Sequence, residues 1–172
     1  TKVAGKGQVD QIFITTTGIG ELQTASQTSG ANARPGDAIL VTGDIGRHGC
    51  TILLARDSYS IDAAVTSDCA PLWPMVSSLL EKTSAIHTMR DATRGGTGTV
   101  LYEIAEESHV GIRLDAAKLP VAPAVRGVCG MLGLDPLYLA CEGRLVIFAP
   151  QENAAQLLET LQQSPYGREA AI

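Results

Sequence analysis

Residues 85–108 read AIHTMRDATRGGTGTVLYEIAEES, in which a strand-like run, a glycine-containing loop and a helix-like run follow one another. The apolar and β-branched residues at the start predict a strand over residues 85–89. Four apolar residues share one helical face and predict a helix over residues 97–108: Val100, Leu101, Ile104 and Ala105. A strand that leads through a loop into a helix indicates an α/β fold.

The same alternation of strands and helices continues along most of the chain. Residues 38–42 (AILVT) are a continuous apolar run, which predicts a strand buried on both faces. Further strands are predicted at residues 110–114 and 144–149, and helices at residues 50–56, 72–80, 125–132 and 154–161. The predicted fold class is therefore α/β, with helices packed on a mixed sheet.

A turn sequence, RPGD at residues 34–37, marks a predicted domain boundary. Before it, residues 8–17 (QVDQIFITTT) predict a strand, and residues 21–32 are polar and predict a linker. We therefore expect residues 1–33 to be the end of a preceding domain with its linker, and residues 34–172 to form one C-terminal α/β domain. The chain begins without a Met and stops inside an apolar stretch, so both ends are expected to be cuts within a longer protein.

Composition and charge argue against two classes of function. Of the 172 residues, 45% are hydrophobic and 18% are charged, as in an ordinary globular protein. The net charge is −5 and the Lys and Arg residues are scattered, so the sequence shows no basic stripe of the kind that binds nucleic acid. The longest apolar runs have about five residues, whereas a membrane span needs roughly 20. The sequence therefore predicts neither nucleic-acid binding nor membrane insertion.

The four cysteines, Cys50, Cys69, Cys129 and Cys141, lie far apart in the sequence and form no CxxC pair. Zinc sites usually take ligands from closely spaced pairs, so no metal site is predicted. Free thiols in a reducing cytoplasm are the expected state of all four cysteines, and a disulfide framework is not expected.

The loop RDATRGG at residues 90–96 is the sharpest candidate for a binding site. It joins a predicted strand to a predicted helix, and free N–H groups at a helix start favour an anion. Its paired glycines allow close approach of a ligand, Arg94 would add a forked donor, and Asp91 would accept a hydrogen bond. An ordinary turn between strand and helix is the alternative, and the residues alone leave both interpretations open.

Two further loops carry polar residues beside glycine. GDIGRHG at residues 43–49 does not fit the dinucleotide pattern GxGxxG, and His48 fits either an ordinary loop residue or a site residue. ACEG at residues 140–143 places Glu142 at the entrance of an apolar strand, where a partly buried carboxylate suits proton transfer. An exposed turn carboxylate is the alternative for Glu142, and Lys2 by itself indicates nothing.

The sequence over residues 90–150, which includes both RDATRGG and LDPLYLACEG, closely resembles the HypE family of hydrogenase maturation proteins. Three further segments resemble it too: TKVAGKGQVDQIFITTTGIG at residues 1–20, PGDAILVTGDIGRHGCTILLAR at residues 35–56 and SPYG at residues 164–167. The resemblance covers nearly the whole chain. Its most specific parts are the loop at residues 91–96 and the segment at residues 134–140. It implies the C-terminal-domain fold of the aminoimidazole ribonucleotide synthetase superfamily.

The resemblance implies an ATP-dependent dehydration in the maturation of [NiFe]-hydrogenase. A carbamoyl group on the enzyme's own C-terminal cysteine loses water and becomes a thiocyanate, from which cyanide passes to the active-site iron. ATP and Mg²⁺ are the implied cofactors, with most of their sites in an N-terminal nucleotide-binding domain. The implied partners are the carbamoyltransferase HypF and the iron-scaffold complex HypC–HypD, and the implied full-length form is a cytoplasmic homodimer.

Site residues follow from the same resemblance. Glu142 matches the glutamate of the family's NEG motif and Lys2 the lysine of its GDTKV motif, and both are implied to lie near the reacting cysteine. Five residues match the family's DPTRGG loop, implied to face the active cleft and expected to bind nucleotide or another anion: Asp91, Thr93, Arg94, Gly95 and Gly96. Cys141 stands where the family usually has Asn, and Cys141 and His48 are expected to support the site.

The chain lacks two parts of the family's pattern, the nucleotide-binding domain and the C-terminal tail Pro-Arg-x-Cys. We therefore expect this chain alone to be inactive. One alternative is another ATP-using member of the superfamily, such as a selenophosphate synthetase or a thiamine phosphate kinase, although the DATRGG form of the loop disfavours both. The other alternative is a module that only docks the carbamoyltransferase or the iron-scaffold proteins.

Overall fold

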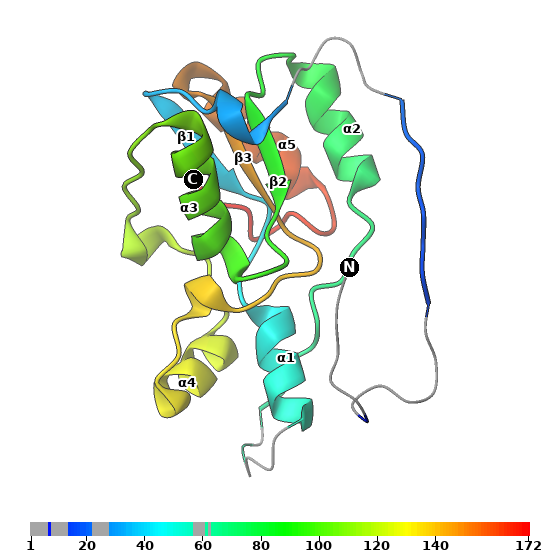
Figure 1. Ribbon diagram of the computed structural model, residues 1–172, viewed down its shortest axis with the longest axis vertical. Helices are drawn as coiled ribbons and strands as arrows, with labels where there is room; N and C mark the ends of the chain where they lie inside the picture. The colour runs from blue at the N-terminus through cyan, green and yellow to red at the C-terminus, as the bar shows by residue number, and fades with distance from the viewer. Residues whose placement is uncertain (1–6, 8–13, 22–27, 57–60, 62) are drawn as a thin grey trace.

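The structure, a computed structural model, describes residues 7, 14–21, 28–56, 61 and 63–172 (Figure 1). The described strands are β1 (Asp37–Val41), β2 (Thr88–Asp91) and β3 (Leu145–Pro150). The described helices are α1 (Arg47–Arg56), α2 (Trp73–Lys82), α3 (Gly96–Ser108), α4 (Pro123–Leu132) and α5 (Gln151–Gln163), with short 3-10 helices η1 (Gly30–Asn32), η2 (Ala116–Lys118) and η3 (Pro136–Tyr138). Among these helices, none is both long and apolar enough to cross a membrane.

The strands form one sheet with β3 in the centre, in the order β1-β3-β2. Both pairings are antiparallel, with Val41 opposite Val146 and Asp91 opposite Leu145. The predicted α/β fold with helices packed on a sheet is confirmed. The described strands are all antiparallel, however, where the sequence predicts a mixed sheet. β1 and β2 do run in the same direction, but β3 lies between them, so they do not pair.

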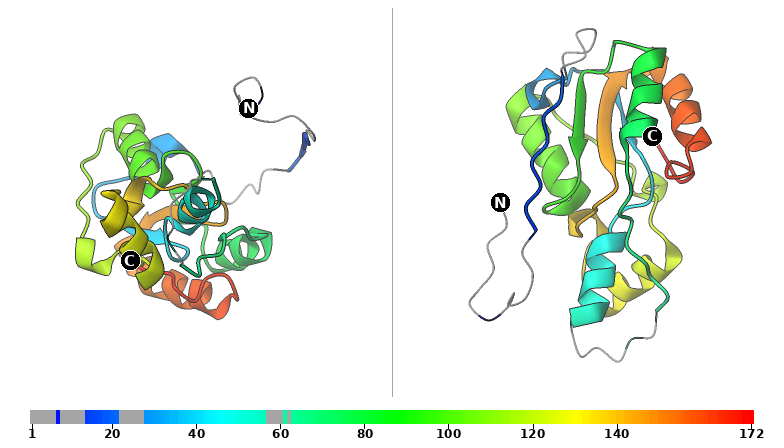
Figure 2. Two further views of the ribbon diagram at one scale, coloured as in Figure 1. Left: turned by 90° about the horizontal axis from the view of Figure 1, so that it is seen from below. Right: turned by 90° about the vertical axis from the view of Figure 1, so that its right-hand side faces the viewer.

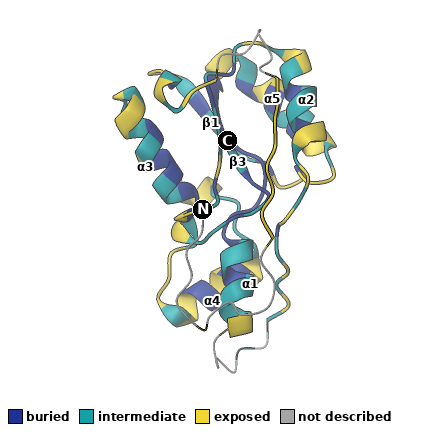
Figure 3. Cartoon of the chain, turned by 45° about the vertical axis from the view of Figure 1, so that its right-hand side comes forward, coloured by how far each residue is buried: buried dark blue, intermediate teal, exposed yellow. Residues whose placement is uncertain are grey.

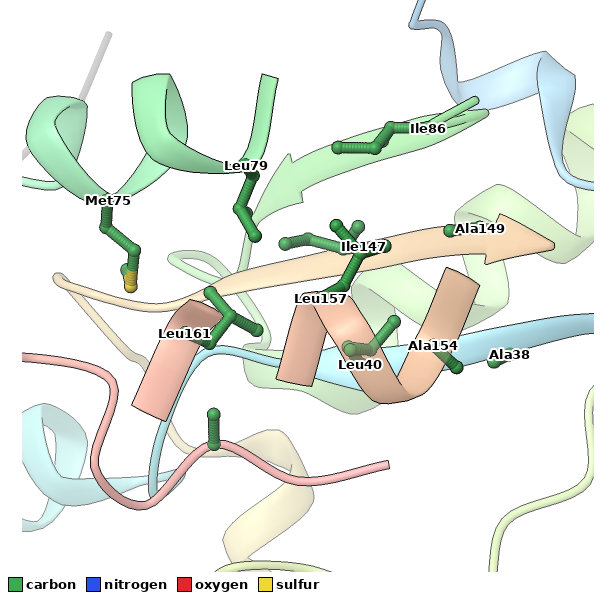
Figure 4. Close-up of a cluster of buried hydrophobic side chains, with 11 residues drawn as sticks. Ala38, Leu40, Met75, Leu79, Ile86, Ile147, Ala149, Ala154, Leu157 and Leu161 are labelled. Carbon is green, nitrogen blue, oxygen red and sulfur yellow. The ribbon is translucent and has the colours of Figure 1, made fainter. Parts of the chain in front are cut away.

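Helices cover both faces of the sheet, because successive side chains of a strand point to opposite faces. On one face, α2 and α5 pack on β1 and β3, and Figure 4 shows Leu79, Leu157 and Leu161 around Leu40 and Ile147. On the other face, α3 packs on β1 and β3 through a second cluster: Val41, Val100, Leu101, Ile104, Val146 and Phe148. Figure 2 shows the sheet between these helical layers. Each fully buried Leu or Ile contributes about 1.5–3 kcal/mol of hydrophobic stabilisation.

β1 takes part in both layers, as its continuously apolar sequence predicts. Its residues Ala38 and Leu40 lie in the cluster with α5, and Val41 lies in the cluster with α3. The predicted burial of this strand on both faces is therefore confirmed.

Helices α1 and α4 lie beyond one end of the sheet and pack on each other (Figures 1 and 3). Cys50 of α1 joins Val125, Val128 and Cys129 of α4 in a small separate cluster. This end of the molecule is also where β1 leads into α1, so the loops at this end of the sheet lie next to the α1–α4 pair.

The predicted helices are confirmed, with shifts at their ends. α1 begins at Arg47, three residues before the predicted start, so His48 lies in the first turn of a helix and not in a loop. The predicted strand over residues 85–89 is displaced to β2, which ends at Asp91. α4 ends as predicted at Gly133, whose left-handed backbone (φ 67°) closes the helix.

The sequence predicts two further strands. The one at residues 110–114 is wrong, and the one at residues 8–17 lies partly outside the described residues. Residues 110–114 form no strand, although Val110 and Ile112 pack against the α3-side cluster. Their alternation therefore reflects burial of one side of an extended segment, without the pairing that makes a strand. Of the predicted strand at residues 8–17, residues 8–13 lie outside the described part, and residues 14–17 carry no strand assignment.

We predict that His109→Gly stabilises the chain by about 1 kcal/mol, because a side chain in the left-handed region costs about 1–2 kcal/mol. His109 caps α3 with φ 55° and is exposed, so only the backbone cost should change. Gly133 caps α4 with φ 67° and open space around it, so Gly133→Ala should destabilise by a similar amount. Urea unfolding of both variants measures the change in the free energy of unfolding. If both variants are stabilised, or both destabilised, the left-handed backbone is not the cause.

Candidate functional site

The three loops singled out by their sequences meet at one end of the sheet. The loop after β1 and the loop after β2 leave the same end, because β1 and β2 both run antiparallel to β3. β3 begins at that end, so the turn at residues 140–144 lies between them. The sheet topology thus brings together segments that are about 50 residues apart or more in the sequence.

Hydrogen bonds tie these three loops to one another. The Cys141 N–H donates to Ala92 O (3.1 Å), and the Ala92 N–H donates to Arg144 O (3.1 Å). On the other side, the Gly49 N–H donates to Ala140 O (2.9 Å), and the Gly46 N–H donates to Cys141 Sγ (3.3 Å). The turn at residues 140–144 is therefore held from both sides.

A buried cluster of charges lies beneath this turn. Arg144 is 4% exposed, and its guanidinium donates to Asp44 Oδ1 (2.6 Å) and Asp44 O (2.8 Å). Asp68 is also buried, and its Oδ2 lies 4.0 Å from Arg144 Nε. Arg47 pairs with Asp44 at 3.0 Å from the partly exposed side. Two carboxylates and two guanidiniums thus neutralise one another, as buried charges must.

Glu142 lies above this cluster with its side chain 25% exposed. Its N–H donates to Asp68 Oδ1 (3.0 Å), and its Oε1 lies 3.8 Å from His48 Nε2. On the far side of the ring, His48 Nδ1 lies 2.9 Å from Ser67 Oγ. The sequence singled out Glu142 and His48 but not Ser67 or Asp68, since the segment between α1 and α2 has no helical or alternating pattern that marks it.

The residues of the predicted anion loop lie at the end of β2 and the start of α3. Asp91 is the exposed last residue of β2, Thr93 is half-buried and Arg94 is exposed. Gly95 is the N-cap residue of α3, with φ 68°. It makes no side-chain cap hydrogen bond, so no side chain of the N-cap residue accepts from the first N–H groups of the helix. The structure brings this loop against Cys141 through Ala92. Lys2 lies outside the described residues.

Gly96 has a packing role in addition to any contact with a ligand. A Cβ at Gly96, where φ is 65°, would run into Leu137 O and Leu139 O. The two most specific segments of the sequence, residues 91–96 and 134–140, therefore pack backbone to backbone. Close approach between two parts of the protein is one reason for the glycine here.

Cys141 is fully buried, and burial raises the pKa of its thiol from the ordinary 9.0 to about 11. Its Sγ accepts from Gly46 N and lies 3.8 Å from Leu139 O. A side-chain amide has both an acceptor and a donor, so Asn at this position would meet the same two partners. Cys141 therefore supports the loops as a structural residue, and as a thiol it is inert at neutral pH.

A pocket of about 370 Å³ opens beside the charge cluster. Its lining is charged and polar and includes Asp44, Arg47, Ser67, Asp68, Cys69 and Arg168. In the part of the chain that the structure describes, no group of three or more His, Cys, Asp and Glu side chains is placed to hold a metal ion.

Comparison with known proteins gives one family and close relatives. The model of the AIR synthase related protein C-terminal domain matches residues 34–172. The chain is 46% identical over 172 residues to the carbamoyl dehydratase HypE of Azotobacter vinelandii, covering 100% of this chain and 50% of that protein. The chain spans about half the length of the curated relatives it matches.

Solved structures of HypE proteins are also similar to this chain. A HypE–HypF complex contains a chain with a TM-score of 0.82 at 41% identity, covering 84% of this chain and 48% of that one. A HypE in complex with ATP has a TM-score of 0.79 at 46% identity, covering 84% and 43%. A thiamine-monophosphate kinase of Stenotrophomonas maltophilia has a TM-score of 0.53 at 21% identity, which shows a shared fold alone.

We predict that Gly143→Ala destabilises the chain by about 1–3 kcal/mol, the usual cost of overpacking. A Cβ at Gly143 would run into Asp68 O and lie 2.9 Å from Ala70 N, so the segment below Glu142 must move. Gly127→Ala is the matched control, because it is exposed in α4 with open space around it. Thermal unfolding of both variants tests this, and an unchanged melting temperature for Gly143→Ala would contradict the packing.

We predict that Cys141→Asn retains the stability of the chain at neutral pH, whereas Cys141→Ala loses about 1–3 kcal/mol by leaving the buried Gly46 N–H unpaired. The raised pKa adds a second test. A thiol whose folded pKa exceeds its unfolded pKa contributes stability below pH about 9 that is lost as the pH rises toward 11. Urea unfolding at pH 8 and pH 10 should therefore show a larger decline for the wild type than for Cys141→Asn.

Proposed function

This chain belongs to the HypE family of hydrogenase maturation proteins, within the AIR synthase related proteins, and we propose that it forms the C-terminal domain of an ATP-dependent carbamoyl dehydratase. The proposed substrate is a carboxamide on the full-length protein's own C-terminal cysteine. The proposed product is a thiocyanate, which supplies cyanide to the iron of [NiFe]-hydrogenase. Because the chain spans about half of its relatives, we expect it to have no activity by itself.

The chemistry of this reaction defines what the residues must do. Amide oxygen is a poor leaving group, and ATP supplies the phosphoryl group that turns it into a good one. Two protons must then leave the amide nitrogen before the C≡N bond is complete. A general base positioned within reach of that nitrogen is therefore required.

Glu142 is the proposed base, and its geometry is the observation that carries the proposal. It is a partly exposed carboxylate on the turn where the three loops meet. Its main chain is fixed by Asp68, and the turn is held by Ala92 and Gly49. Because the main chain at Glu142 is fixed in this way, the point from which the carboxylate projects is set before the reaction. Lys2, which the described residues do not include, is proposed as its electrostatic partner.

The loop at residues 91–96 is proposed to contact an anionic group of the nucleotide or of the phosphorylated intermediate. The start of α3 fits such a group, since Gly95 caps it without a side-chain hydrogen bond and Arg94 is exposed beside it. Asp91 and Thr93 complete the proposed polar rim of this anion site. The family resemblance implies a separate nucleotide-binding domain, and we propose that Mg²⁺ and most of the ATP contacts lie in the part of the longer relatives that this chain does not span.

The proposed partners are HypF, which a related HypE binds in a solved complex, and the iron-scaffold complex HypC–HypD. The proposed assembly is a homodimer of the full-length protein in the cytoplasm. The kinase alternative has only the shared fold in its favour, at 21% identity.

We predict that Glu142→Gln in the full-length protein lowers the dehydration rate by about 10²–10⁴-fold, the usual contribution of a general base. The assay carbamoylates the C-terminal cysteine, adds ATP and follows the loss of one water by mass spectrometry. Glu159→Gln, on the exposed side of α5, is the matched control and should react at the wild-type rate.

Near-normal dehydration by Glu142→Gln would refute the assignment of the base. Failure of the wild-type protein to lose water under the same conditions would refute the proposed reaction itself. Urea unfolding of Glu142→Gln shows whether a lower rate comes from a loss of stability.

A further inference from the structure

His48 lies between Glu142 and Ser67 and is the link between two segments of the site. It occupies the first turn of α1, and its side chain is 21% exposed. Its Nε2 faces Glu142 Oε1 at 3.8 Å and its Nδ1 faces Ser67 Oγ at 2.9 Å. Neither the reaction scheme above nor the family resemblance gives this ring a defined task.

The contacts of Ser67 link the protonation of the His48 ring to Cys69. Ser67 Oγ donates its one hydrogen to Cys69 Sγ (3.1 Å) and accepts from the Cys69 N–H (3.2 Å). When Ser67 Oγ donates its hydrogen to Cys69 Sγ, it can only accept from His48, and His48 Nδ1 then carries the proton; this tautomer is part of the inference below. The neutral ring then presents the lone pair of Nε2 toward Glu142.

We propose that His48 acts through Glu142, by taking up the proton that Glu142 removes from the substrate nitrogen. This inference rests on the proposed dehydration, in which two protons must leave the same nitrogen in turn. The O–H bond of protonated Glu142 breaks and a new N–H bond forms at His48 Nε2. Glu142 becomes a carboxylate again and is ready for the second proton.

The arrangement suits this transfer in three respects. The imidazolium that forms keeps both of its N–H groups paired, one with Ser67 and one with the regenerated carboxylate. Both side chains are partly exposed, so a torsional change of Glu142 can shorten the 3.8 Å separation to hydrogen-bond length. The exposed part of the ring lets His48 release the proton to solvent between turnovers. Ser67 is thus a positioning residue that fixes the tautomer.

The tautomer can be measured without any activity. Full-length protein labelled with ¹⁵N-histidine should show the His48 ring with its proton on Nδ1 at a pH where the ring is neutral, and Ser67→Ala should remove this preference. Assignment of the signal comes from its loss in His48→Asn. A proton on Nε2 in the wild type would overturn the proposal, and this outcome is independent of whether the protein dehydrates a carboxamide.

Activity provides the second test. His48→Asn in the full-length protein should lower kcat at least ~10-fold, a smaller loss than that of the base itself. His109→Asn removes an exposed histidine far from Glu142 and is the matched control. His48→Ala should regain activity when free imidazole is added, because a diffusible ring can take up the proton but cannot restore packing.

The two proposals fail in different ways. Wild-type kcat in His48→Asn, or a slow His48→Ala that imidazole does not accelerate, would overturn the proton role of His48 while the dehydration stands. A wild-type protein that does not dehydrate its carboxamide overturns the proposed function, and the tautomer measurement then still decides the arrangement of the ring.

Discussion

The buried guanidinium of Arg144 is the contact on which the site depends. It binds the side chain and the main chain of Asp44 from the loop after β1, faces Asp68 from the segment before α2, and lies at the entrance of the central strand. Removing one partner of such a buried pair typically costs about 3–5 kcal/mol, because the other charge is left without compensation. Asp68 in turn accepts from the Glu142 N–H, so the position of Glu142 depends on this cluster.

Much of the fold could be predicted from the sequence, because apolar periodicity and terminating residues mark helices directly. α3 and α4 lie within two residues of their predicted ends, and Gly133 closes α4 as predicted. The strand predicted at residues 110–114 is wrong, because alternation records which side chains face a core and contains no information about main-chain partners. The same limit explains why the direction of the strands in the sheet was not predictable.

The residues of the site likewise fall into those that the sequence indicates and those that it does not. Glu142 and the loop at residues 91–96 could be singled out because each combines polar residues with glycine next to a strongly patterned strand or helix. Ser67 and Asp68 could not, since their segment is short, aperiodic and about 75 residues from Glu142. The order β1-β3-β2 places the ends of β1 and β2 beside the start of β3. The connection between α1 and α2 then brings Asp68 to the Glu142 N–H. A constellation that depends on strand order is invisible to spacing along the chain.

The glycines show how one sequence feature can have two physical causes. Glycine beside polar residues predicts close approach of a ligand, and the same pattern arises when two backbones pack together. Here a Cβ at Gly49 would lie 2.8 Å from Ala140 N, and one at Gly43 would lie 2.7 Å from the Arg144 side chain. Gly96 and Gly143 are confined in the same way by neighbouring loops. These glycines therefore allow three loops to interlock, and the side chains that project from the interlocked loops, Glu142 first among them, are left to carry the chemistry.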